Sequence, residues 1–237
     1  MRVVEFAGTF CAGKMWLLAS VKEQLRSYTV ETIARDLVIA SEMAHPTDYL
    51  ARQILLTNDV TNQLIKFRDL RMPNLLVLVH RGLYDTLAFL SAYVKAGVIP
   101  QTRASPQLAA FRANAELLTD LVVLVKTPVE IAFRRAKSKF SGFFQLEKPD
   151  IVFTKEFFEV LDQAYAELEQ NLPPNSIIID GTEKVEKNVN KILIEGIDPV
   201  LVQAELKQKE EGSTWREGNR KVKRQRQTIN NANATLA

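Results

Sequence analysis

Residues 2–18 read RVVEFAGTFCAGKMWLL, and this stretch decides the fold. The apolar run Arg2–Phe6 predicts a buried strand, and the apolar residues after Lys14 predict the start of a helix. Between them, four residues separate Gly8 from Gly13-Lys14, which is the spacing of a phosphate-binding loop. Backbone N–H groups in such a loop turn inward around an anion, and the helix adds its dipole. The alternative is that two glycines and a lysine meet at a strand–helix turn for packing reasons.

We call residues 8–13 the glycine loop, and we predict that it and the residues just after it bind a nucleotide. The expected nucleotide-binding residues are Gly8, Thr9, Phe10, Cys11, Ala12, Gly13, Lys14, Met15 and Trp16. Lys14 would reach the β- and γ-phosphates as a mobile charge. For Cys11 we favour the role of a small residue that fills the loop, and the alternative is a thiol whose pKa is lowered by the inward N–H groups.

The rest of the chain alternates between short apolar runs and amphipathic helical stripes. Further apolar runs occur at Thr29–Ile33, Leu75–Val79, Leu121–Val125 and Ser176–Ile179. They lack polar alternation, as expected of parallel strands buried on both faces. Pro100 and Pro128 fall at element boundaries. We therefore predict an α/β fold, a five-stranded parallel sheet with helices on both faces in a three-layer sandwich, with ligands beyond the carboxyl ends of the strands.

Charged residues follow the second and third predicted strands. Glu31 and Arg35 belong to the second, and the third is followed by Arg81 and Asp85. The two arginines suit recognition of an anion such as an acceptor phosphate. Asp85 is the best-placed metal or water ligand, or alternatively caps the helix that follows. For Glu31 the alternative is a solvated strand end.

Three motifs together resemble the P-loop nucleoside and nucleotide kinases. These are GTFCAGK at residues 8–14, ETIAR at residues 31–35 and HRGLYDTLAF at residues 80–89. The patterns are similar to those of thymidylate kinase and of the ribosylnicotinamide kinase-like group, and the resemblance covers about residues 1–195. It implies an ATP-dependent phosphotransferase that acts on a nucleoside, a nucleotide or a similar small-molecule acceptor.

The resemblance also implies roles for individual residues. It implies catalytic residues at Lys14, Arg81, Asp85, Arg134 and Arg135, with one of the last two stabilising the migrating phosphoryl group. Glu31, Arg35 and Arg81 would face the acceptor. Gly181 and Thr182 would border the adenine of ATP.

Two residues depart from this pattern, and they occupy the positions that lie nearest to the metal ion in the superfamily. Met15 stands where a Ser or Thr hydroxyl is expected, and His80 where those kinases carry Asp. Thioether and imidazole groups are poor ligands for Mg²⁺, which prefers oxygen donors. A hydrogen-bonding or core role therefore suits His80 better. We expect Mg²⁺ as a cofactor, with its protein ligand open and Asp85 the remaining carboxylate. The alternative function is a nucleotide-binding regulatory protein with weak or no catalysis.

The sequence predicts a kinase-like domain at residues 1–197 and a charged C-terminal extension at residues 198–237. A lid is expected at about residues 134–150. It begins with a cationic cluster, Arg134, Arg135, Lys137 and Lys139. The cluster suits phosphoryl transfer, which depends on positioned charge, but it is equally typical of a solvated helix end.

Composition supports a cytoplasmic protein. The 237 residues are 46% hydrophobic, carry a net charge of +3 and contain one cysteine, and no apolar run is long enough to span a membrane. Residues 216–226 alone carry +5, which leaves the remainder at −2. This tail either aids solubility or contacts nucleic acid, in which case it would be the working part of the chain. A homodimer is also conceivable through the helical face around residues 87–94.

Overall fold

The structure is a computed structural model, and it describes residues 1–25, 28–34, 48–70, 72, 74–144 and 150–201. Met1–Asp198 form one compact unit. Arg35, part of the expected lid and the basic segment 216–226 lie outside the described residues, so the expectations for them stay predictions. No helix in the described ranges is long and apolar enough to cross a membrane.

Five parallel strands form one sheet in the order β2-β3-β1-β4-β5, which confirms the predicted α/β fold. The strands are β1 (Arg2–Ala7), β2 (Thr29–Ala34), β3 (Leu75–His80), β4 (Leu121–Lys126) and β5 (Ile177–Asp180). Central β1 pairs with β3 on one side and β4 on the other, with Phe6 opposite both His80 and Val123. Strands β1, β3 and β4 are almost fully buried, because helices cover both faces of the sheet.

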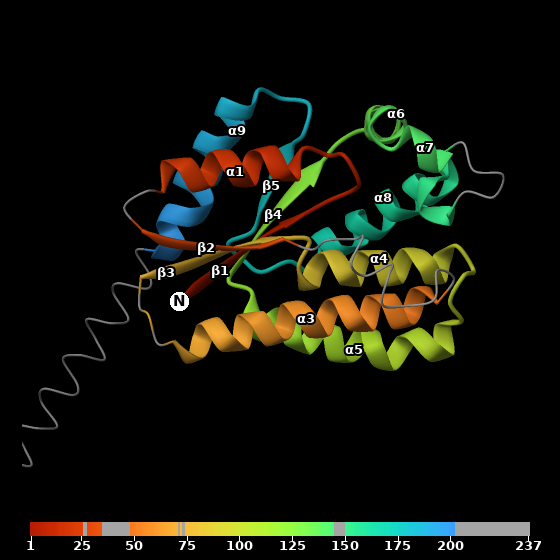
Figure 1. Cartoon of the computed structure of the whole chain (residues 1–237), viewed down its shortest axis with the longest axis horizontal. Helices are drawn as coiled ribbons and strands as arrows, with labels where there is room; N and C mark the ends of the chain where they lie inside the picture. Colours follow the sequence, from red (N-terminus) through yellow and green to blue (C-terminus); the bar gives the residue numbers. More distant parts are fainter. Residues whose placement is uncertain (26–27, 35–47, 71, 73, 145–149, 202–237) are drawn as a thin grey trace, which may run out of the picture. The chain divides into compact units, whose positions relative to one another are not determined.

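The helices lie in two layers (Figure 1). They are α1 (Lys14–Gln24), α3 (Tyr49–Asp69), α4 (Leu83–Lys95), α5 (Gln101–Leu118), α6 (Val129–Lys139), α7 (Ser141–Phe144), α8 (Lys155–Glu169) and α9 (Val185–Lys191), with short turns at Ile151–Phe153 and Ile192–Ile197. Helices α1 and α9 pack together on one face of the sheet, and α4 packs with α3, α5 and α8 on the other.

Helix α4 is buried within the chain, which corrects the expectation that its surface pairs with a second copy. Leu87, Phe89, Leu90 and Tyr93 are each at most 4% exposed. Their positions suggested a free apolar face, but α3, α5 and α8 surround this helix and cover it. The face around residues 87–94 is therefore part of the domain core.

The N-terminus of α4 is capped by a carboxylate from the central strand. Glu5 in β1 is 1% exposed, and it accepts hydrogen bonds from the backbone N–H groups of Tyr84 (3.0 Å) and Asp85 (2.7 Å). A Cβ atom at Gly82 would lie 2.5 Å from Glu5 Oε2, so only glycine leaves room for this carboxylate. The negative charge of Glu5 meets the positive end of the α4 dipole. The contact fixes where α4 begins relative to β1.

The substitution Glu5→Gln should therefore destabilise the domain. The amide side chain keeps the shape of the carboxylate but turns one acceptor oxygen into an NH₂ donor that faces a backbone N–H. We expect the free energy of unfolding to fall by about 1–3 kcal/mol. Urea denaturation measures it, with exposed Glu23→Gln in α1 as the control, expected to change by less than about 0.5 kcal/mol. Equal values for the two variants would show that Glu5 does not act as the cap.

Candidate functional site

A cavity of about 840 Å³ lies beside the glycine loop, at the carboxyl ends of the parallel strands. Its walls come from the loop, the first turn of α1, the end of β3, helix α6 and the segment after β5. The lining residues are Phe10, Cys11, Ala12, Gly13, Lys14, Met15, Trp16, Leu17, His80, Arg81, Arg135, Lys139, Phe140, Gly181, Thr182, Glu183, Val185 and Asn188. The location is the one expected for a ligand in a parallel α/β sheet.

At two positions of the glycine loop, the backbone has a conformation that only glycine adopts easily. Gly8 has φ 137° and Gly13 has φ 102°. A Cβ atom at Gly8 would lie 2.3 Å from the Val125 carbonyl oxygen, so the loop can approach β4 only without a side chain there. Cys11 also has a positive φ of 55°. Gly8 and Thr9 are not on the cavity wall, whereas residues 10–16 are.

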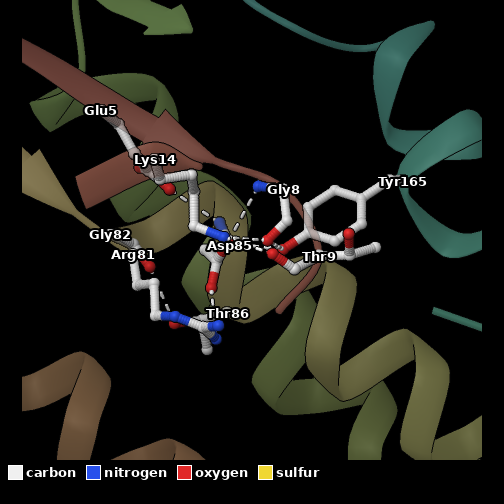
Figure 2. A network of polar contacts seen from close by, with 9 residues as sticks. All are labelled: Glu5, Gly8, Thr9, Lys14, Arg81, Gly82, Asp85, Thr86 and Tyr165. Atoms are coloured by element: carbon white, nitrogen blue, oxygen red, sulfur yellow. Dashed lines mark hydrogen bonds and ion pairs between the residues drawn. The ribbon is translucent and has the colours of Figure 1, made fainter. Parts of the chain in front are cut away.

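Lys14 lies on the cavity wall, but its ammonium group is directed back to the loop (Figure 2). Its Nζ donates hydrogen bonds to the carbonyl oxygens of Gly8 and Thr9, the latter at 2.6 Å. Burial, reinforced by the nearby Arg81 charge, lowers the pKa of Lys14 to about 7. An anion in the cavity would favour the charged form and give Nζ a better partner than the loop carbonyls.

Asp85 connects three elements of the fold behind the loop (Figure 2). Its Oδ1 accepts hydrogen bonds from Gly8 N–H (3.2 Å) and from the Tyr165 hydroxyl in α8 (2.5 Å), and the hydroxyl oxygen lies 2.9 Å from the Gly8 carbonyl oxygen. Asp85 Oδ2 lies 3.6 Å from Arg81 Nη1. Asp85 itself is fully buried. Sequence reasoning missed Tyr165, because a tyrosine on an apolar helical stripe gives no sign of its hydroxyl's partner.

Arg81 is held in a strained position against two aromatic rings. Its φ is 62°, which is rare for a non-glycine residue. Its guanidinium carbon lies 4.2 Å from the ring centroid of Phe10 and 5.2 Å from that of Phe89. The residue is only 6% exposed, yet it forms part of the cavity wall. These contacts fix the guanidinium beside the loop.

His80 is uncharged at neutral pH. Burial, together with the nearby Arg81 and Lys14 charges, lowers the pKa of His80 to about 3. Its Nδ1 is buried without a hydrogen-bond partner among the described residues, and the residue lines the cavity. The imidazole therefore presents a neutral polar group to a ligand.

The far wall of the cavity holds the cationic end of α6 and the segment after β5. Arg135 Nη1 lies 3.4 Å from the Cys11 carbonyl oxygen and 3.3 Å from the Gly181 carbonyl oxygen. A Cβ atom at Gly181 would lie 2.1 Å from Thr127 Oγ1, so the segment needs glycine to approach the loop. Thr182 donates to Asp180 Oδ1 from both N (2.8 Å) and Oγ1 (2.7 Å).

Two other expected site residues lie elsewhere. Glu31 is the third residue of β2, pairs with Val77 and is exposed, so it is three residues away from the strand's carboxyl end. Arg134 is exposed and does not line the cavity, which places Arg135 and not Arg134 at the site. The Cys11 thiol has a pKa raised by burial, so the alternative of a lowered pKa is wrong.

The residues expected nearest to a metal ion fit Mg²⁺ poorly. Asp85 Oδ1 is used by Gly8 and Tyr165, and a cation bound at Oδ2 would lie against the Arg81 guanidinium. The cavity wall carries a thioether at Met15 and an imidazole at His80. In the ranges that the structure describes, no cluster of three or more His, Cys, Asp or Glu side chains is arranged to hold a metal. The predicted metal role of Asp85 does not suit this geometry.

The lowered pKa of Lys14 predicts a pH dependence of stability. The unfolded chain keeps the ordinary lysine pKa, so below pH 7 both states are protonated and burial of the ammonium carries its full cost. Between pH 7.5 and 9.5 only the unfolded state holds the proton, and stability rises with pH by up to about 1.4 kcal/mol per pH unit. The difference between wild type and Lys14→Met in urea denaturation isolates this slope. A pH-independent difference would contradict the lowered pKa.

No family model matches the chain, and no curated protein matches its sequence. Several solved structures match its fold. One is deoxyadenosine kinase from M. mycoides with bound dATP, with a TM-score of 0.58 and 18% identity over 81% of this chain and 97% of that chain. The same enzyme with bound dCTP gives a TM-score of 0.61 at 18% identity over the same shares. Thymidylate kinase from Candida albicans gives 0.60 at 15% identity over 81% of this chain and 89% of that one. The chain therefore has the fold of the P-loop nucleoside and nucleotide kinases.

Proposed function

We propose that the chain is an ATP-dependent phosphotransferase of the nucleoside or nucleotide kinase type. The observation that carries the proposal is one cavity lined by the glycine loop together with Lys14, Arg135 and Lys139. A glycine loop at the start of a helix and cations around one cavity suit a nucleoside triphosphate. The matches to deoxyadenosine kinase and thymidylate kinase support the same class.

In this proposal, catalysis rests on position and charge. The bond between the γ-phosphorus and the β–γ bridging oxygen breaks, and a bond from an acceptor oxygen to that phosphorus forms. ADP leaves with the bridging oxygen, and the acceptor proton passes to solvent. Lys14 would bind the donor phosphates, and Arg135 would stabilise charge on the migrating group. Gly181 and Thr182, which line the cavity, would border the adenine.

The acceptor would lie on the side of the cavity where Arg81 is held against Phe10 and Phe89. A fixed guanidinium suits a planar or bidentate anion better than a mobile lysine does. We therefore favour an acceptor that already carries a phosphate, although a nucleoside remains the alternative. Of the two other residues expected here, Glu31 is on the exposed edge strand and Arg35 is outside the described residues.

A second candidate function is a nucleotide-binding regulatory protein with little or no catalysis. Met15 and His80 favour it, because both line the cavity and neither supplies the oxygen ligand of an active metal site. Both candidate functions require a bound nucleotide, and they differ in whether the protein transfers phosphate. A phosphoryl-transfer assay with radiolabelled ATP and a panel of nucleosides and nucleoside monophosphates separates them.

We expect that assay to show transfer in the wild type and none in Lys14→Ala, which loses the phosphate-binding ammonium. A protein that binds ATP in a thermal-shift measurement but transfers no phosphate to any acceptor would favour the regulatory function. A protein that neither binds ATP nor transfers phosphate would contradict both.

The adjacent arginines of α6 give a sharper test of the site. Arg135→Gln removes a cation from the cavity wall and should weaken ATP binding by roughly tenfold, which corresponds to ~1.4 kcal/mol. Arg134→Gln should have a smaller effect, because Arg134 is exposed outside the cavity. Isothermal titration calorimetry measures the Kd of each variant for ATP. Exposed Arg103→Gln in α5 is the control for loss of a surface charge. A larger loss in Arg134→Gln would overturn the assignment.

A further inference from the structure

The charged groups of the cavity are almost all positive. Arg81, Arg135 and Lys139 line it together with one carboxylate, Glu183, among the residues that the structure describes. Lys14, whose pKa is lowered to about 7, adds a further positive charge when an anion binds. His80 adds no charge at neutral pH because its pKa is lowered to about 3. Such a wall attracts a polyanion strongly and a divalent cation poorly.

The buried carboxylates near the loop are engaged within the fold, apart from Asp85 Oδ2, which has no hydrogen-bond partner among the described residues. Glu5 accepts from the N-terminus of α4, and Asp85 accepts from Gly8 N–H and the Tyr165 hydroxyl. Asp85 Oδ2, the remaining acceptor, faces the Arg81 guanidinium at 3.6 Å and is not on the cavity wall. A metal ion there would replace an existing attraction with a repulsion between two cations.

The two residues nearest to the expected metal position also lack the oxygen ligands that Mg²⁺ prefers. Met15 follows Lys14 at the start of α1 with 49% exposure, so a thioether occupies the place of a hydroxyl ligand. His80 ends β3 opposite Phe6 of β1 and offers a neutral nitrogen where a carboxylate would be needed. Neither side chain compensates the charge of Mg²⁺.

We propose that this site binds a nucleoside triphosphate as the free polyanion, without a divalent cation, and that Lys14, Arg135 and Lys139 supply the counter-charge. The inference rests on the proposed nucleotide-binding function and concerns the form of the ligand. A free triphosphate keeps the charge that Mg²⁺ would neutralise, so it interacts more strongly with these three cations around the cavity. Lys14 exchanges the Gly8 and Thr9 carbonyl oxygens for phosphate oxygens when the ligand enters.

Calorimetric titration of the full chain with ATP, once with EDTA and once with excess Mg²⁺ at matched ionic strength, tests the proposal. We expect the Kd in EDTA to be smaller by roughly three- to tenfold, and the advantage to shrink at high salt. Binding only with Mg²⁺, or tighter with Mg²⁺, would overturn this inference and leave the nucleotide-binding function intact. No binding under either condition would overturn both.

The double variant Met15→Thr/His80→Asp provides the matched comparison. It restores a hydroxyl and a carboxylate at the two positions and should shift the ratio of the two Kd values toward Mg²⁺. If the ratio of the two Kd values is unchanged in a folded double variant, Met15 and His80 do not cause the preference for the metal-free nucleotide. The wild-type pair of titrations decides the main proposal even if the variant does not fold.

Discussion

The buried Asp85 carboxylate is the group on which the site geometry depends. It joins the glycine loop, α4 and α8 through Gly8 N–H and the Tyr165 hydroxyl, while Glu5 holds the start of α4 on the central strand. An unpartnered buried carboxylate is costly, so each of these contacts keeps the others in place. The position of the loop is therefore set by polar contacts deep in the domain as well as by the strand that precedes it.

This arrangement also determines the charge that the cavity presents. Asp85 is close enough to pair with one cavity cation, Arg81. Arg135 and Lys139 on α6 line the cavity too, but they are exposed and form no ion pair with a carboxylate in the described part of the chain. A ligand rich in phosphate oxygens satisfies both requirements, because it provides acceptors for the loop N–H groups and negative charge for α6.

The sequence predicted the parts of the molecule that depend on local pattern. The five strands, the glycine loop and the helix starts after Pro100 and Pro128 agree with the structure, because apolar runs and backbone breakers act over a few residues. The contacts of Tyr165 were not predictable in this way. Its hydroxyl meets Asp85, 80 residues away, and that pairing exists only once α4 and α8 pack together. Likewise, the cap of α4 comes from Glu5 on another element, and not from Asp85.

The contacts of Arg81 explain how its strained backbone conformation is held in place. Its left-handed backbone costs free energy of order 1–3 kcal/mol, which the surrounding structure must offset. Two aromatic rings and the Asp85 carboxylate do so by holding the guanidinium where it contributes to the cavity wall. The backbone N–H of Arg81 also donates to the Phe6 carbonyl oxygen at 3.2 Å, which joins the strained residue to the central strand. A residue fixed in this way contributes to ligand selection through its position. The site thus combines a buried, strained cation with the exposed cations Arg135 and Lys139, which suits a ligand that is held at one end and reacts or is sensed at the other.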